Sequence, residues 1–371
     1  MAITPINMPV SRPPRILVLA DTPALGMKMM TTQEIRGLRD RYTDAEIGVL
    51  TSSSGARFYE NCPHRIHLHK VQDEGVFSNK GLHSVAPYIR AGQYDAVVSL
   101  PFQEYYYSSL VVDEGMRFPF RIGSNKILSG IMDRFENEIP QYEVFTHDVR
   151  PPCGIFAPEE YMGSAMLRYL EPFGITGQEM RPEAWSSEKD KLAVDDLLVR
   201  SGILPEDFLV TLNLRANQNH NQWRLSTLIE AVSQMSGFWF RQDLLKKYGR
   251  LVFLVNYYKP EQQHYFRNFN SALRNFSDIQ APVIGMPNNG PGELASIIAR
   301  SRYVITPETG TAHVAQALDV PCTVVYINEE VARGWQLPGG RVMSIISNVE
   351  DVSPDDIFSG SMGAIFQWCR R

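Results

Sequence analysis

The chain has 371 residues but few cysteines, and none of them forms a paired motif. The four are Cys62, Cys153, Cys322 and Cys369, and no two stand in C-x-x-C spacing. A zinc knot or a dithiol redox site is therefore not expected. Cys322 falls within an apolar run and is interpreted as a small core residue. This cysteine usage predicts a reducing compartment, the cytoplasm.

A strong charge bias and long hydrophobic runs are also missing. The formal net charge is −5 and the pI is near 5.9, which argues against a nucleic-acid-binding protein. No stretch approaches the roughly 18 apolar residues that a membrane helix needs. The apolar run at residues 16–20, after Arg12 and Arg15, is too short for a signal peptide. Peripheral membrane contact and the oligomeric state stay open.

Several motifs for phosphate and metal chemistry are absent as well. There is no Walker loop, no Gly-x-Gly-x-x-Gly after the first apolar run, and no Asp-x-Asp pattern. His64, His67 and His69 alternate as on one face of a strand, but the local sequence supplies no carboxylate or cysteine partner. We therefore predict no metal site.

Short apolar runs alternate with helical patterns along the whole chain, which predicts parallel sheets covered on both faces. The expected strands are residues 16–20, 46–51, 94–100, 120–123, 208–214, 251–256, 282–285, 303–306 and 322–327. The expected helices are residues 31–41, 158–170, 188–199, 225–235, 291–300 and 354–368.

The length exceeds that of one ordinary domain, so two domains are expected. The apolar rhythm breaks between Gly174 and Pro205, and we place the boundary there. The prediction is one domain over residues 1–180 and a second over 181–353. Residues 354–371 are expected to form a closing helix, with packing on the first domain as one option.

The most informative stretch is residues 303–326. An apolar strand leads into a small polar turn, a short helix capped by Thr309 or Thr311, and a second strand after Pro321. This order predicts a parallel βαβ unit. Its turn contains Gly310 and meets a helix N-terminus, where unpaired amides and the helix dipole favour an anion. A nucleotide phosphate is the natural ligand for such a turn.

Residues 304–321 resemble the signature of the heptosyltransferase family, glycosyltransferase family nine. That signature runs from a strand into Asp-Thr-Gly, two further residues, His, a helix of small residues and Pro. In this chain Glu308 stands in place of the Asp. The matching positions are Thr309, Gly310, His313, Ala315, Ala317 and Pro321. Further segments with a similar pattern are residues 15–32, 94–100, 121–123, 213–224 and 291–300. The alternative is that any parallel α/β protein can own such a unit.

The resemblance implies a GT-B architecture, with two doubly wound, Rossmann-like α/β domains facing a central cleft. It implies a metal-independent, inverting transfer of a sugar to a hydroxyl of a glycan or small-molecule acceptor. The donor would be a nucleotide-sugar, with heptose linked to ADP, and no other cofactor is expected. The first domain would hold the acceptor and the second the donor.

On the acceptor side, the resemblance points to the loop that contains Thr22, Gly26 and Met27. The family has an Asp after the glycine, which resembles a general base, whereas Met27 cannot take a proton. Asp21 is the nearest replacement, and its alternative role is to cap or order the loop. Weaker candidates for the base are Asp148, Glu104 and His147. Residues 105–107, three consecutive tyrosines, either line an acceptor site or cover the sheet, and cover is favoured.

On the donor side, Thr309, Gly310 and Thr311 would offer amides and hydroxyls to the diphosphate, and Gly310 lets the backbone approach closely. Glu308 would meet a ribose or sugar hydroxyl. His313 would either pack as a polar core residue or stabilise charge on the leaving group.

The family's phosphate-loop lysine aligns with Asn221. Arg215 and Arg224 flank this loop, and each is predicted either to reach the diphosphate or to lie solvated at the surface. Trp223 is expected to pack in the core rather than to stack against a nucleobase.

Met27 and Asn221 motivate a second hypothesis, a non-catalytic GT-B protein or subunit that binds a nucleotide-sugar. A third is another enzyme of the same architecture, such as a sugar-nucleotide epimerase.

Overall fold

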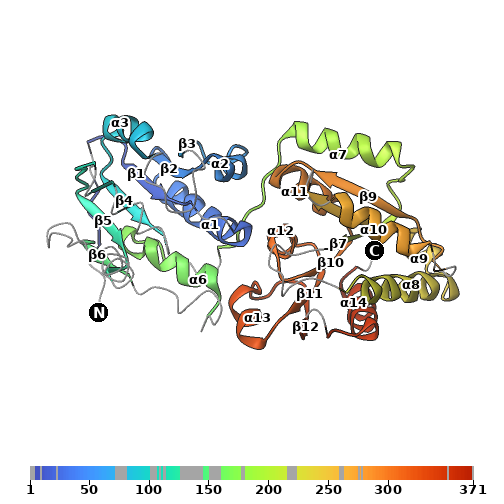
Figure 1. Cartoon of the computed structure of the whole chain (residues 1–371). Coiled ribbons are helices and arrows are strands. Elements are labelled where there is room, and N and C mark those ends of the chain that lie inside the picture. Colours follow the sequence, from blue (N-terminus) through green and yellow to red (C-terminus); the bar gives the residue numbers. More distant parts are fainter. Residues whose placement is uncertain are drawn as a thin grey trace. The chain divides into compact units, whose positions relative to one another are not determined.

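The computed structural model divides into two compact units, Met1–Glu183 and Ala184–Arg371. It describes the chain except for residues 1–4, 9–10, 22–23, 72–81, 101–106, 108–109, 112–113, 126–144, 150–159, 177–179, 215–223, 259–262, 275, 277–278, 349–350 and 370–371. Each unit is an α/β domain built on one six-stranded parallel sheet (Figure 1). The parallel α/β class is as the sequence predicted, whereas the number of strands was not predicted.

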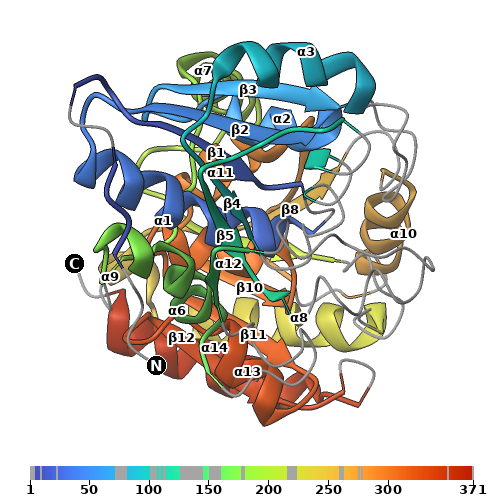
Figure 2. The ribbon, with the colours of Figure 1, turned by 90° about the vertical axis from the view of Figure 1, so that its left-hand side faces the viewer.

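The first sheet has the order β3-β2-β1-β4-β5-β6. Its strands are β1 (Arg15–Leu19), β2 (Glu46–Ser52), β3 (Ile66–Val71), β4 (Ala96–Ser99), β5 (Phe120–Gly123) and β6 (His147–Asp148). The described helices of this unit are α1 (Leu25–Arg41), α2 (Ser53–Tyr59), α3 (Leu82–Gly92), α6 (Met162–Leu167) and the 3₁₀ helix η4 (Arg168–Phe173). Figure 2 shows β3, β2 and β1 as neighbours, with α3 beside β3.

The second sheet has the order β12-β11-β10-β7-β8-β9. Its strands are β7 (Phe208–Asn213), β8 (Leu251–Tyr258), β9 (Val283–Asn288), β10 (Tyr303–Pro307), β11 (Cys322–Tyr326) and β12 (Val342–Ile346). Its described helices are α7 (Glu188–Arg200), α8 (Leu225–Arg241), α9 (Leu245–Tyr248), α10 (Gln263–Leu273), α11 (Pro291–Arg300), α12 (Gly310–Ala317), α13 (Glu329–Trp335) and α14 (Pro354–Trp368).

Counted within its own unit, each sheet has the strand order 3-2-1-4-5-6. This is the doubly wound order in which ligands bind at the carboxyl ends of the strands, where the order reverses. The reversal falls between β1 and β4 in the first sheet and between β7 and β10 in the second. Each sheet therefore has one preferred binding edge.

The expected strands and helices are present. The structure adds elements that were not predicted, namely β6, β12, α2, α3, α9, α10 and α13, and it has a strand, β3, that only the alternating histidines suggested. Some helix ends also differ. Helix α1 begins at Leu25 rather than at residue 31. The prediction missed its first turns because they are buried on all sides and so lack a helical apolar period. The expected helix at 158–170 is shorter: α6 ends at Leu167, and the chain continues as a 3₁₀ helix that includes Pro172.

The sequence allowed the last helix to pack on the first domain. The structure places α14 in the second unit, against α8, β11 and β12. Ile357 and Ile365 of this helix lie in the same apolar cluster as Trp239 of α8. Burial of that face explains where the helix packs.

Candidate functional site

The signature segment lies at the carboxyl edge of the second sheet, where β10 and β7 are neighbours. The turn after β10 leads directly into α12, with Thr309 as its N-cap in extended conformation. The β7 strand next to it ends at Asn213. The turn therefore occupies the topological reversal of the sheet, the place where doubly wound folds bind ligands.

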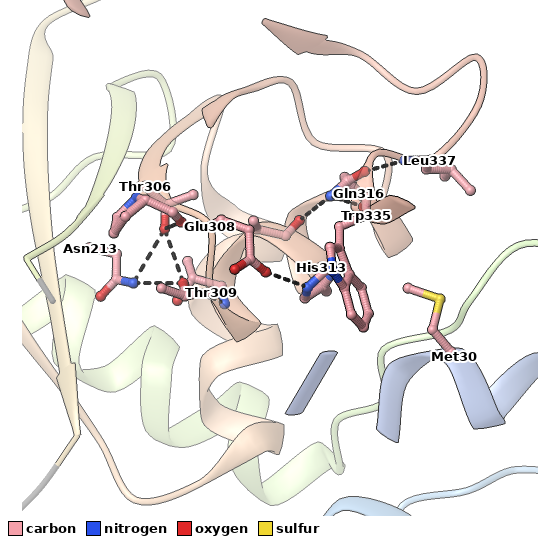
Figure 3. A network of polar contacts seen from close by, with 12 residues as sticks. Met30, Asn213, Thr306, Glu308, Thr309, His313, Gln316, Trp335 and Leu337 are labelled. Atoms are coloured by element: carbon pink, nitrogen blue, oxygen red, sulfur yellow. Dashed lines mark hydrogen bonds and ion pairs between the residues drawn. The ribbon is translucent and has the colours of Figure 1, made fainter. Parts of the chain in front are cut away.

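A saturated hydrogen-bond network holds this turn (Figure 3). Thr306 Oγ1 donates to the carbonyl of Pro307 at 2.8 Å, so Thr309 is the donor in its 3.2 Å contact with Thr306. Thr309 Oγ1 in turn accepts from Asn213 Nδ2 at 3.0 Å and from the Thr311 amide at 3.2 Å. A threonine hydroxyl has one donor and two acceptor positions, and all three are used here.

This network changes which groups are open to a ligand. The Thr309 hydroxyl and the Thr311 amide already serve the turn. Within the described part of the chain, the Gly310 amide has no intramolecular acceptor, and it lies at the first position of α12. Gly310 is half-buried, while Thr311 is buried. The groups offered to an anion are therefore the Gly310 amide and the positive end of the α12 dipole.

Glu308 and His313 form a second contact beside the turn. His313 Nε2 lies 3.3 Å from Glu308 Oε1, and the two side chains are 3% and 22% exposed. The His313 ring packs edge-on against Trp335 of α13, with 5.2 Å between ring centroids. His313 Nδ1 is buried without a hydrogen-bond partner among the described residues, so the Nε2 proton is the one that Glu308 accepts. His313 thus lies in the interior and orients Glu308.

Gln316 joins α12 to the chain after α13. Its Oε1 accepts from the Leu337 amide at 2.5 Å, and its Nε2 donates to the carbonyl of Trp335 at 3.4 Å. Figure 3 shows this link on the far side of His313 from Thr309. The link holds Trp335 in place behind the imidazole.

The structure describes only one of the other residues predicted for the donor side. Arg215, Asn221 and Trp223 lie outside the described residues. Arg224 is exposed and occupies the position before the first residue of α8.

In the first unit, Asp21 follows β1 at the carboxyl edge of its sheet. Its Oδ1 accepts from the Ser52 amide at 2.8 Å and from Thr51 Oγ1 at 3.4 Å. Ser52 is itself the N-cap of α2. Asp21 therefore orders the β2–α2 junction through one of its oxygens.

The neighbouring residues of that loop are less accessible. Met27 lies in the first turn of α1 and is 3% exposed, so its thioether packs in the core. Gly26 is buried in the same turn. Thr22 lies outside the described residues.

The weaker candidates have structural contacts. Asp148 and His147 form β6, where Asp148 Oδ1 accepts from the Asn125 amide at 2.8 Å. Tyr107 is 1% exposed and packs on Phe145, with 4.3 Å between ring centroids, which favours its role as cover for the sheet. Glu104 lies outside the described residues.

The three histidines considered for a metal site lie on and just before β3. His67 and His69 lie on β3, while His64 precedes it and contacts Glu183 at 2.7 Å. Across the described ranges, no three His, Cys, Asp or Glu side chains gather closely enough to hold a metal ion. No helix in the described part of the chain has the length and apolarity needed to cross a membrane.

Sequence reasoning missed the residues that build the site from neighbouring strands. Asn213 holds Thr309, and Asn256 with Asn288 continues a polar row along the same edge. The available signal was that an Asn stands at or near the carboxyl end of each of these three apolar strands. In parallel sheets that position faces ligands.

Searches against family models and against curated proteins found no match. Solved structures do match over nearly the whole chain. A glycosyl transferase of family 9 from Veillonella parvula has a TM-score of 0.74 and 16% identity, covering 95% of this chain and 98% of its own. The ADP-heptose LPS heptosyltransferase II of E. coli has a TM-score of 0.64 and 16% identity, with 95% and 99% coverage. The E. coli heptosyltransferase WaaC, solved with ADP, has a TM-score of 0.60 and 13% identity, also with 95% and 99% coverage. The chain thus has the two-domain α/β fold of the family nine glycosyltransferases, which confirms at the level of the fold the resemblance found in the sequence.

Proposed function

We propose that the protein is a glycosyltransferase that moves a sugar from a nucleoside diphosphate donor to an acceptor hydroxyl. The observation that carries this proposal is the turn at the reversal of the second sheet, where the Asn213–Thr309 network holds the Gly310 amide at the start of α12. Such a terminus stabilises the negative charge that develops on a leaving diphosphate. The shared fold supports the same class of reaction.

The donor in this proposal is an ADP-linked heptose, and the acceptor is a hydroxyl of a glycan or small molecule. The acceptor oxygen forms a bond to the anomeric carbon while the bond from that carbon to the diphosphate breaks. The electron pair leaves with ADP, and the acceptor proton passes to Asp21. Direct displacement inverts the anomeric centre. Glu308, held by His313, accepts a hydrogen bond from a hydroxyl of the ribose or sugar. Arg224 is a further candidate contact to the diphosphate.

We infer that no metal takes part, since the sequence lacks the Asp-x-Asp pattern of metal-dependent sugar transfer. The cysteines are sparse, and the three that the structure describes are free, which supports a cytoplasmic reaction.

Transfer assays with the purified chain and a panel of nucleotide-sugars test the proposal. Replacement of Asp21 by Asn keeps an oxygen for the Ser52 amide but removes the base, so the rate should fall by roughly 10²-fold or more. The matched control is D190N, because Asp190 also accepts a backbone amide, that of Ser187 at 2.8 Å, but lies in the first turn of α7. Equal rates for D21N and the wild-type protein would contradict the role of Asp21 as base.

A non-catalytic nucleotide-sugar-binding protein is the second candidate, because Met27 is buried where the family has its base and Asp21 already serves the β2–α2 junction. Calorimetry with ADP, UDP and GDP distinguishes the two: binding without turnover across the panel supports this candidate. Release of an isomerised nucleotide-sugar in the absence of an acceptor would instead indicate an epimerase.

A further inference from the structure

The junction between β9 and α11 contains the one Asn-Gly pair of the chain, Asn289 and Gly290. Strand β9 ends at Asn288, and α11 begins at Pro291 with Gly290 as its N-cap. An asparagine carboxamide can be attacked by the backbone nitrogen of the next residue, and glycine favours this reaction because it has no side chain to shield that nitrogen. The junction is therefore a candidate for spontaneous covalent change.

The local structure leaves the reacting atoms open. Asn289 is exposed. The Gly290 amide, the nucleophile of this reaction, donates no hydrogen bond to any residue that the structure describes. Gly290 is extended, with φ 170° and ψ −176°, and a Cβ built on it would meet nothing within 4 Å. There is thus room beside the nitrogen for the carboxamide to approach.

Glu293, in the first turn of α11, restrains the carboxamide. Its Oε2 accepts from the Asn289 backbone amide at 2.9 Å, and both of its oxygens accept from Asn289 Nδ2 at 3.0 Å. Hydrogen bonds to an ionised acceptor are stronger than those between neutral groups. Rotation of the carboxamide toward Gly290 has to break them, so Glu293 slows the attack.

We propose that Asn289 is a site of spontaneous deamidation whose rate is set by Glu293. The Gly290 nitrogen loses its proton and forms a bond to Asn289 Cγ, while the bond from Cγ to Nδ2 breaks. Nδ2 takes up a proton and leaves as ammonia, so a cyclic succinimide remains. Water then opens the ring at either of its carbonyl groups, which gives aspartate or isoaspartate. The sequence of steps includes no oxidation or reduction, and water is the only co-reactant.

Both products change the start of α11. Each puts a carboxylate where Nδ2 stood, 3.0 Å from the oxygens of Glu293, so repulsion between like charges replaces two hydrogen bonds. Isoaspartate also routes the backbone through the side chain and lengthens it before the helix. Helix α11 packs against α12, the helix that begins at the Thr309 turn. Deamidation should therefore loosen α11 beside the candidate site.

Peptide mapping of the full chain by mass spectrometry, after incubation at pH 6 and at pH 9, tests the proposal. Residue 289 should gain the mass that replacement of NH by O adds, and faster at pH 9, because the nucleophile must lose its proton. The products should include isoaspartate, which direct hydrolysis of the carboxamide does not give. The internal control is Asn268 of α10, which is also exposed but precedes Phe269 and should stay unchanged.

Two variants test the roles of the neighbours. G290A should deamidate several-fold more slowly, because its methyl group shields the nitrogen, and the open space at Gly290 accommodates it. E293A should deamidate several-fold faster, because the carboxamide is released, while E293Q keeps one acceptor oxygen and should fall between E293A and the wild-type protein. Unchanged hydrogen exchange of the β9 amides in E293A would show that the effect is not unfolding of the junction.

The outcomes bear on separate parts of the proposal. Conversion at Asn289 that is slower in G290A and faster in E293A supports it. A residue 289 that stays intact through prolonged incubation at pH 9 would overturn it. A wild-type rate in G290A, or aspartate without isoaspartate, would overturn the succinimide route, and a wild-type rate in E293A would overturn the role of Glu293.

Discussion

Glu34 is a buried acid whose replacement should stabilise the first unit at neutral and alkaline pH. It lies on α1, is fully buried, and neither carboxylate oxygen has a hydrogen-bond partner among the described residues. Burial removes water from the ionised form and raises the pKa of Glu34 well above its ordinary value of 4.5, and a contact with its own backbone offsets only part of this effect. The native state therefore keeps the carboxyl protonated where the unfolded chain has ionised it.

The sign and size of the effect follow from proton linkage. Below pH 4.5 both states hold the proton and no penalty exists. As the pH rises above that value, the unfolded state releases the proton first, and stability falls by about 1.4 kcal/mol per pH unit until the raised native pKa is reached. Glu34→Gln removes the titration, so the variant should match the wild-type protein near pH 4.5 and exceed it increasingly above. Glu34→Met should add about 1–3 kcal/mol by removing an unsatisfied polar group.

The assay can follow each unit separately. All five tryptophans lie after residue 183, so tryptophan fluorescence reports the second unit, and hydrogen exchange of α1 amides reports the first. In urea unfolding from pH 5 to 9, the gain in the free energy of unfolding should appear in the exchange of the α1 amides and not in the tryptophan fluorescence. The control is Glu60→Gln, an exposed acid paired with Lys70, with an expected change below about 1 kcal/mol. Parallel pH curves for the wild-type protein and E34Q would refute the reasoning, and so would a variant that is less stable at every pH.

Other substitutions test the frame of the candidate site and the packing of each unit. Thr309→Ala should destabilise the second unit by about 1–3 kcal/mol and weaken ADP binding, since the cap and the Asn213 contact are lost, whereas Thr309→Ser should retain both in urea titrations and calorimetry. Gly48→Ala should destabilise the first unit by about 1–3 kcal/mol or more in thermal unfolding, because the added Cβ would lie 2.1 Å from the Tyr94 hydroxyl. Gly363→Ala, in α14 with nothing within 4 Å of the new Cβ, should instead stabilise by up to about 1 kcal/mol, and a loss there would contradict the packing described.

Local sequence was sufficient for the signature unit. The run from Tyr303 to Pro307, the cap at Thr309 and the helix that follows all depend on residues within a few positions of one another. Hydrophobic period and capping chemistry are local properties, so they predicted this βαβ unit without tertiary information. The same holds for α11 and α14, whose bounds match the prediction and whose first helical residue is a proline.

The start of α1 could not be found in this way. Its residues from Gly26 to Ile35 are buried on every side, so the apolar stripe that marks a surface helix is missing. The role of Asp21 was equally hidden, because Ser52, which it contacts, lies 31 residues away.

The sequence alone determined that the chain forms parallel α/β domains with a capped turn suited to an anion, because strand period, turn chemistry and capping are written in neighbouring residues. Only the tertiary structure decided which groups meet at that turn. Asn213 reaches Thr309 across 96 positions, and Asn256 meets Asn288 across 32. Such pairings depend on strand order and register, which arise when the whole sheet assembles and which no short stretch of sequence encodes.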